Sequence, residues 1–73
     1  MKNLCEAIPG DIIRIVKNNT NSSLKERLLA LGMTEGANIE VLRKGPKNNL
    51  TVYRIRGAMI ALRNEETKYI YCN

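Results

Sequence analysis

The residues of this chain that could do chemistry are two cysteines, Cys5 and Cys72, and two neighbouring carboxylates, Glu65 and Glu66. Thiolates and carboxylates both bind metal ions, and a carboxylate pair invites comparison with Fe²⁺ or Mn²⁺ sites. The sequence contains no His, however, which is the commonest general base and metal ligand. Two isolated thiolates do not complete a zinc site, and two adjacent carboxylates lack a third ligand. We therefore expect no metal site, no cofactor and no catalytic residue.

The length of the chain leads to the same expectation. Its 73 residues are enough for one domain, which we place at residues 1–73. A domain of this size buries only about 60% of the surface that its unfolded chain exposes, so its core is too thin to enclose a deep substrate cavity as well. No segment resembles a phosphate-binding glycine loop or a nucleophile elbow. We expect a protein that is not an enzyme and has no small-molecule substrate.

The charge balance is basic, with 12 Lys and Arg against 7 Asp and Glu, a net charge of +5. Such a balance attracts nucleic acid, an anionic membrane surface or an acidic protein. A net charge of this size is also enough simply to keep a protein soluble, without any charged partner. The charges here are dispersed along the chain and not gathered in runs, which is typical of a solvated surface. Both interpretations stay open at this point.

Nucleic-acid binding is the alternative function that the arginines raise. Arg54, Arg56 and Arg63 share an outward parity on two expected strands, and small β-barrels do bind nucleic acid. Stacking of bases normally needs aromatic side chains, and the chain offers only three tyrosines. Tyr53 has inward parity, which leaves Tyr69 and Tyr71. Nucleic acid is therefore an unlikely partner on these grounds, without being excluded.

The sequence favours a cytoplasmic protein. The first residues lack the apolar segment of a signal peptide, and no apolar run approaches the roughly 20 residues that span a bilayer. The thiols of Cys5 and Cys72 are then expected to stay reduced. We interpret both as small, buried, apolar residues at strand positions, and they are neighbours if the two ends of the chain lie side by side.

One short helix, with its start and stop signals, is expected from Ser23 to about Leu31. Ser23 and Glu26 have the spacing of a capping box, in which each side chain bonds to a backbone N–H of the first turn. Gly32 supplies the left-handed residue that ends a helix. Three leucines recur at helical spacing and predict the stripe that faces the core: Leu24, Leu28 and Leu31.

The remainder of the chain predicts short strands. Apolar and polar residues alternate in segments bounded by turn formers, at residues 11–17, 37–44, 50–56, 59–63 and 69–72. Residues 64–68 are expected to form a single helical turn capped by Asn64. Five strands, one helix and one helical turn predict a mainly β fold, a small SH3-like barrel, because closure of the sheet removes most exposed edges.

The order of these motifs along the whole chain resembles the FeoA-type ferrous iron transport domain, which is an SH3-like barrel. The chain departs from the family pattern at residues 48–50, where Gly-Asp-Pro is frequent, and at Thr67, where Ala is usual. The matching motifs are Pro9-Gly10, Arg27-Leu28-Leu29-Ala30-Leu31-Gly32-Met33 with Gly36, Val41-Leu42-Arg43 before Pro46, Arg56-Gly57, Ile60-Ala61-Leu62-Arg63, and Glu65-Glu66 before Ile70.

The resemblance implies a small cytosolic accessory protein of bacterial ferrous iron uptake. Such proteins are thought to act on the cytosolic GTPase domain of the large membrane iron transporter. Similar domains follow the DNA-binding and metal-binding domains of metal-dependent repressors, but this chain has no helix-turn-helix. The resemblance therefore implies regulation by protein–protein interaction, with the iron chemistry carried by the partner.

The helix also provides a candidate partner-binding surface. Leu29 lies well off the core stripe, near Lys25, so its side chain is expected to point outward. It is either a scattered surface leucine, which is common, or an apolar anchor for a partner. Met residues recur at adaptable binding surfaces. The candidate partner-binding residues are Lys25, Arg27, Leu28, Leu29 and Met33.

Overall fold

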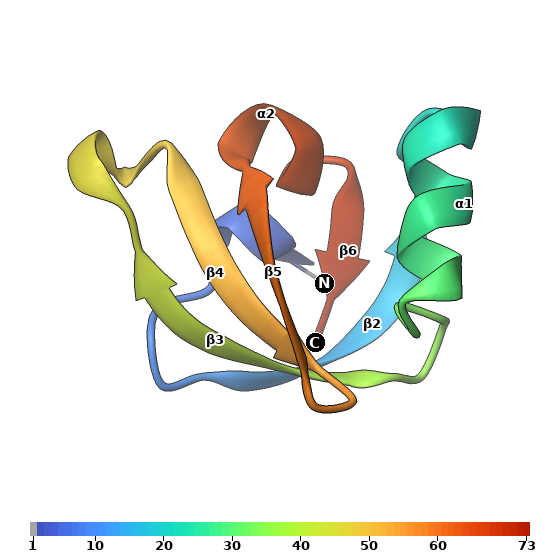
Figure 1. Cartoon of the computed structure of the whole chain (residues 1–73), viewed down its shortest axis with the longest axis horizontal. Helices are drawn as coiled ribbons and strands as arrows, with labels where there is room; N and C mark the ends of the chain where they lie inside the picture. The colour runs from blue at the N-terminus through green and yellow to red at the C-terminus, as the bar shows by residue number, and fades with distance from the viewer. Residues whose placement is uncertain (1) are drawn as a thin grey trace.

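The computed structural model describes residues 2–73 and shows one antiparallel sheet that curls around a core, with a short helix against it (Figure 1). Met1, the first residue of the expected domain, lies outside the described residues. The elements in chain order are β1 (Lys2–Asn3), the 3-10 helix η1 (Leu4–Glu6), β2 (Ile12–Asn18), α1 (Ser22–Ala30), β3 (Asn38–Lys44), the 3-10 helix η2 (Pro46–Asn48), β4 (Leu50–Ile55), β5 (Ala58–Arg63), α2 (Asn64–Thr67) and β6 (Ile70–Cys72).

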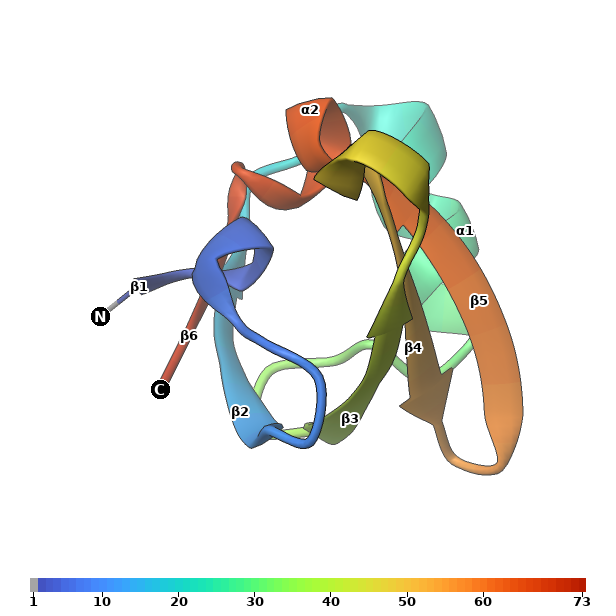
Figure 2. The same ribbon diagram turned by 90° about the vertical axis from the view of Figure 1, so that its left-hand side faces the viewer.

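The sheet has six strands in the order β1-β6-β2-β3-β4-β5, and the predicted mainly β, SH3-like architecture is confirmed. The strand beyond the five expected is β1, which pairs Lys2 with Cys72 and is only two residues long. An alternating pattern cannot be recognised in two residues, which is why the sequence did not reveal it. Two register shifts, between Ile15 and Lys17 and between Val41 and Arg43, help to bend the strands around the core (Figure 2).

The core lies inside the curl of the sheet, and the predicted inward faces are confirmed. Ile13 and Ile15 of β2 are buried, as are Ile39 and Val41 of β3. Leu62 of β5 is fully buried too, whereas Ile60 packs against the core while keeping part of its surface exposed. On β4 the alternation places three side chains inward: Thr51, Tyr53 and Ile55.

Helix α1 begins one residue earlier than expected, and the predicted capping box is wrong. The cap is Asn21, whose side-chain Oδ1 accepts a hydrogen bond from the backbone N–H of Leu24 at 2.9 Å. Ser23 lies inside the first turn instead. Asn and Ser are nearly equal as helix caps, so the short-range sequence signal could not decide between Asn21 and Ser23.

The end of α1 is a two-bond closure around Gly32. The N–H of Gly32 donates to the carbonyl of Leu29 at 3.0 Å, and the N–H of Met33 donates to the carbonyl of Leu28 at 2.9 Å. Gly32 has φ +104°, the left-handed conformation that this closure requires. The closure returns the chain to the core, where Met33 and Leu28 are both fully buried.

The prediction that Leu31 completes the core stripe is wrong. Leu24 and Leu28 are buried, but Leu31 is the C-cap and remains 37% exposed. Helical periodicity holds only while the helix continues, and α1 ends at Ala30. The core position that a further helical turn would have filled is taken by Met33.

The helical turn α2 forms where it was expected, but Asn64 is not its cap. Arg63 occupies the cap position, and its backbone N–H donates to the Glu66 carboxylate at 2.9 Å. The carboxylate of Glu66 thus satisfies a free donor at the start of the turn.

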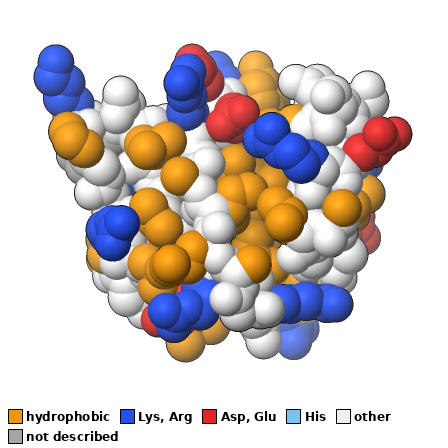
Figure 3. All heavy atoms as spheres, viewed as in Figure 1, with side chains coloured by type: hydrophobic (Ala, Val, Ile, Leu, Met, Phe, Trp, Pro, Cys, Tyr) orange, Lys and Arg blue, Asp and Glu red, His pale blue; other side chains and the backbone are white. Residues whose placement is uncertain are grey.

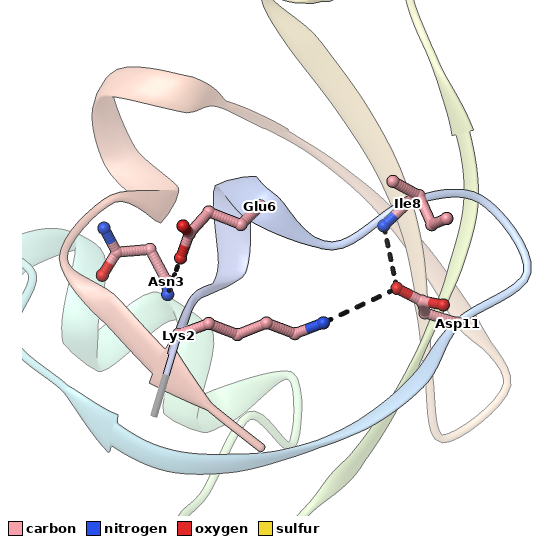
Figure 4. Close-up of polar contacts among 5 residues, drawn as sticks. All are labelled: Lys2, Asn3, Glu6, Ile8 and Asp11. Carbon is pink, nitrogen blue, oxygen red and sulfur yellow. Dashed lines mark hydrogen bonds and ion pairs between the residues drawn. The ribbon is translucent and has the colours of Figure 1, made fainter.

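The N-terminal segment is tied to the turn that precedes β2 (Figure 4). The backbone N–H of Asn3 donates to the Glu6 carboxylate at 2.7 Å, and that of Ile8 donates to the Asp11 carboxylate at 2.9 Å. The Lys2 ammonium lies 3.9 Å from the same Asp11 carboxylate. These contacts hold β1 and η1 against the start of β2.

We predict that two neighbouring leucines of α1 differ sharply in their effect on stability. Leu28→Ala should lower the free energy of unfolding by about 2–5 kcal/mol, because it opens a cavity in a thin core. Leu29→Ala should lower it by less than about 0.5 kcal/mol, because the side chain lies at the surface. Chemical denaturation of both variants measures the difference, and equal losses would contradict the packing described for α1.

We predict that the cap of α1 can be located by substitution. Asn21→Ala should cost about 1 kcal/mol of stability, since it removes the acceptor for the Leu24 N–H. Ser23→Ala is the matched control and should be close to neutral, because Ala suits a helix interior. Thermal unfolding of the two variants compares them, and a larger loss for Ser23→Ala would restore the capping box.

Candidate protein-interaction surface

The outward face of α1 carries an apolar side chain with charged residues of both signs nearby. Leu29 is 42% exposed, as its position off the core stripe predicted. Lys25 lies one turn before it on the same face of the helix, and Arg27 is exposed as well. Helix α1 is held by its buried residues and presents Leu29, two cations and the Glu26 carboxylate to solvent.

Two of the candidate partner-binding residues lie in the core and not on this outward face. Leu28 and Met33 are each 0% exposed, so the prediction that they contact a partner is wrong. They anchor α1 to the core from beneath and thereby fix the direction of Leu29. The Met33 error arose because a Met after a helix end was interpreted as a surface residue, whereas the closure at Gly32 returns the chain to the core.

The turn between β4 and β5 reaches the end of α1. Arg56 and Gly57 are its two residues, with φ of 49° and 82°, the left-handed pair of a tight hairpin turn. The Arg56 side chain passes directly over Gly32, where a Cβ would lie 2.8 Å from the Arg56 Cδ. Gly32 is therefore needed for its backbone conformation and for this close approach.

The three outward-facing arginines considered for nucleic-acid binding do not act as one group. Arg54 pairs with Glu40 at 3.3 Å, and Arg63 pairs with Glu65 at 3.7 Å. Arg56 lies in the turn rather than on a strand and packs against α1. Since two of the three already face carboxylates, these arginines offer less free positive charge than the sequence suggested.

The tyrosines give little support for stacking of bases. Tyr53 is fully buried in the core, as its parity predicted, and Tyr71 is half-buried. Tyr69 is largely exposed, and the Lys68 ammonium lies 5.3 Å from its ring centroid. Residues 2–73 thus present one accessible tyrosine ring rather than a row of them.

The cysteines and carboxylates considered first do not gather into a metal site within residues 2–73, where no cluster of three or more potential ligands is found. Cys72 is buried in β6, whereas Cys5 is half-buried in η1 and not on a strand as expected; both are free thiols. Burial raises the pKa of the Cys72 thiol, and the nearby Glu6 and Cys5 add to this while Lys2 opposes it.

A groove that sequence reasoning missed separates the start of α1 from α2. Its cavity of about 370 Å³ lies between the loop that leads into α1 and the segment after β5. Figure 3 shows apolar surface in the hollow between β5 and α1, with charged side chains around it. No sequence signal could locate the groove, because its two walls are far apart in the chain. Its lining residues are Asn19, Thr20, Asn21, Leu24, Glu65, Glu66 and Tyr69.

Comparison with protein families matches residues 2–73 to the family described as FeoA domain. Comparison of the sequence with curated proteins gives no match.

Comparison with solved structures finds several with the same fold. The FeoA protein from Chlorobium tepidum superposes with a TM-score of 0.92 at 25% identity, covering 97% of this chain and 68% of its own. Iron(II) transport protein A from Clostridium thermocellum superposes with a TM-score of 0.88 at 28% identity. The match covers 97% of this chain but only 44% of that protein's chain. A zinc complex of FeoA from Stenotrophomonas maltophilia, described as a procaryotic SH3 domain protein, gives 0.77 at 23% identity, with coverages of 100% and 91%.

We predict that stability falls at alkaline pH through two buried groups. Burial raises the pKa of Cys72 above its ordinary 9.0 and that of Tyr53 above its ordinary 10.0; the hydroxyls of Thr51 and Thr67 only partly oppose the shift of Tyr53. As the pH rises, these groups therefore ionise in the unfolded chain before they ionise in the folded one. The stability that they contribute is complete below about pH 9, and it is lost as the pH rises above that value through the raised pKa values of the folded protein.

The measurement is the urea midpoint of unfolding between neutral pH and the alkaline range. Tyr53→Phe should flatten the decline, whereas the control Tyr69→Phe, at an exposed position, should leave it unchanged. Identical pH profiles for the two variants would contradict the assignment to Tyr53.

Proposed function

This chain belongs to the FeoA domain family, which is associated with ferrous iron transport, and on that premise we propose that it is an accessory protein of bacterial ferrous iron uptake. In this proposal it acts by binding the cytosolic GTPase domain of the membrane iron transporter. The family match extends over residues 2–73, so the whole described domain supports the premise.

The observation that carries the proposal is the exposed Leu29 on the outer face of α1. Its side chain is 42% exposed although the helix beneath it is firmly packed, with Leu28 and Met33 fully buried. An apolar side chain on a rigid element, surrounded by polar residues, is suited to bind a partner because little entropy is lost on association. Lys25, one helical turn before Leu29, adds positive charge at the rim, where charge mainly accelerates the encounter. Arg27 is exposed on the opposite flank of α1 and adds to the positive charge of the helix as a whole.

Regulation by contact fits the chemistry of the chain better than catalysis. The family is one of accessory proteins rather than enzymes. Within residues 2–73 the candidate ligands do not form a group that could hold iron. The iron in this proposal is bound and moved by the transporter, and the present chain changes what the GTPase domain does.

The proposed location is the cytoplasm, where that GTPase domain is found. In the part of the chain that the structure describes, no helix has the length and apolarity needed to cross a bilayer. The thiols of Cys5 and Cys72 are free, as a reducing compartment would keep them.

Nucleic-acid binding remains the alternative, favoured by the net charge of +5. The two candidate functions differ in their response to salt. Binding to nucleic acid weakens steeply as salt rises because it depends on released counterions. Docking through an apolar side chain persists at high salt. An NMR titration with the GTPase domain and with RNA, each at low and high salt, separates them.

We predict that Leu29→Ala weakens binding to the isolated GTPase domain by at least about 1 kcal/mol, the scale of an interface hot spot. The matched control is Ile12→Ala, which removes an equally apolar and more exposed side chain from β2. It should bind like the wild type. Titration calorimetry on the two folded variants makes the comparison.

Wild-type affinity for a folded Leu29→Ala variant would remove the α1 face from the proposal. Tight RNA binding with no chemical-shift change from the GTPase domain would overturn the proposal itself.

A further inference from the structure

In the part of the chain that the structure describes, strand β5 is an edge of the sheet with no strand paired to its outer side, and its central residues lack the side chains that usually block an edge. It pairs with β4 over six residues without a register shift, and no strand of residues 2–73 pairs with its other side. Natural edge strands are usually blunted by Lys, Pro or a bulge. The segment Ala58-Met59-Ile60-Ala61-Leu62 contains neither Lys nor Pro, and Met59 is 66% exposed.

The hydrogen-bond pattern shows which backbone groups face outward. The Asn64 N–H donates to the Asn49 carbonyl at 3.1 Å, so this pair is a bonded one. Bonded and non-bonded pairs alternate along an antiparallel ladder. By this alternation, the backbone N–H and C=O groups of Ile60 and Leu62 point toward β4. The N–H and C=O groups of Met59 and Ala61 point away from β4.

Arg63 provides an independent check of this parity. By the same alternation its N–H should point outward, and it does, because it donates to the Glu66 carboxylate at 2.9 Å. The Glu66 carboxylate therefore closes the far end of the edge. The Arg56 turn marks the near end, and Met59 and Ala61 form the open stretch between them.

Helix α1 stands on the open side of β5 (Figure 1). The Arg56 side chain lies over Gly32 and so connects the β4–β5 turn to the end of α1, which closes the space between β5 and α1 at one end. The cavity of about 370 Å³ beside Leu24 and Tyr69 lies at the other end, where β5 leads into α2. The hollow between the walls is lined with apolar surface (Figure 3). An added strand pairs about 4.8 Å from its neighbour through backbone groups alone, so an extended segment is the form of partner that this edge can bind.

We propose that the edge of β5 binds a short, extended, acidic segment of the protein partner as an added strand, between β5 and α1. This inference rests on the proposed function, since it describes how the interaction module recognises its partner. Four backbone groups of Met59 and Ala61 supply the hydrogen bonds, and alternate apolar side chains of the segment enter the hollow.

The charges select an acidic occupant. No carboxylate of residues 2–73 forms an ion pair with Arg56, which lies at one end of the hollow, so its guanidinium is available to a carboxylate of the segment. Glu65 and Glu66 line the cavity at the other end, so the acidic residue of the segment belongs at the Arg56 end. A second copy of this chain is a poorer occupant. Its own β4 would accompany its β5 into the space beside α1, and both copies carry a net charge of +5.

The test substitutes Ala61, whose N–H faces outward and whose side chain is exposed. Ala61→Pro removes that N–H without removing a bond to β4, and proline is tolerated at such edge positions. It should weaken binding to the isolated GTPase domain by about tenfold or more, as a lost hydrogen bond and a steric clash imply. Ala61→Thr keeps the N–H and should weaken binding less than Ala61→Pro does, and the control Ile12→Ala, on β2 and outside the edge, should bind like the wild type.

Amide hydrogen exchange on the wild-type protein makes the test independent of whether the proline variant folds. The Met59 and Ala61 amides should exchange fast in the free protein and slowly in the complex, whereas those of Ile60 and Leu62 are protected in both states. A synthetic peptide alternating Val and Glu serves as a second probe, with Lys in place of Glu as its control.

The outcomes separate this inference from the proposed function. Binding of the GTPase domain without protection of Met59 and Ala61 overturns the strand addition and leaves the proposed function standing. If that domain does not bind, the proposed function fails, and protection by the Glu peptide but not by the Lys peptide still supports the edge site. Protection that grows with protein concentration alone assigns the edge to a second copy and overturns the inference.

Discussion

The closure at the end of α1 is the constraint on which the rest of this structure depends. One backbone hydrogen bond, from the Met33 N–H to the Leu28 carbonyl, turns the chain back and places the Met33 side chain in the core. That bond needs the left-handed backbone of Gly32, and the missing side chain at Gly32 lets Arg56 pass across the helix end. The orientation of α1, the exposure of Leu29 and the wall beside β5 all follow from this arrangement.

A small domain has few means of fixing a helix, which explains why this closure matters. Helix α1 has only nine residues, too few to be stable alone, and just two of its leucines are buried. Met33 supplies a third apolar contact from outside the helix. Because the helix is held at its end and along one side, its outer face is free to carry residues chosen for a partner.

The sequence was sufficient to predict most of the fold because the strands alternate clearly. The alternation fixes which face of each strand points to the core. Each of two strands buries two apolar residues of one face: Ile13 and Ile15 on β2, and Ile39 and Val41 on β3. Local signals failed where two residues compete on nearly equal terms. Asn21 and Ser23 both make good caps, and the local sequence does not rank one above the other.

The candidate site was predictable only in part, for a physical reason. The direction of Leu29 follows from helix geometry within a few residues, so the sequence placed it correctly. The burial of Met33 depends on a turn that periodicity cannot describe. The groove and the free edge of β5 depend on contacts between segments more than twenty residues apart, such as Gly32 and Arg56. Surfaces formed in this way have no signature in a single sequence.

The pairing of β1 with β6 brings both ends of the chain to the same side of the barrel. Lys2 lies opposite Cys72 in that pair, and Figure 2 shows β1 and β6 side by side on the opposite side of the molecule from β5. A polypeptide joined to either end would leave the β5 and α1 face uncovered. The domain is therefore built like a module: it can be carried by a longer chain, tethered to a surface or labelled at its ends while its proposed binding face stays open to a partner.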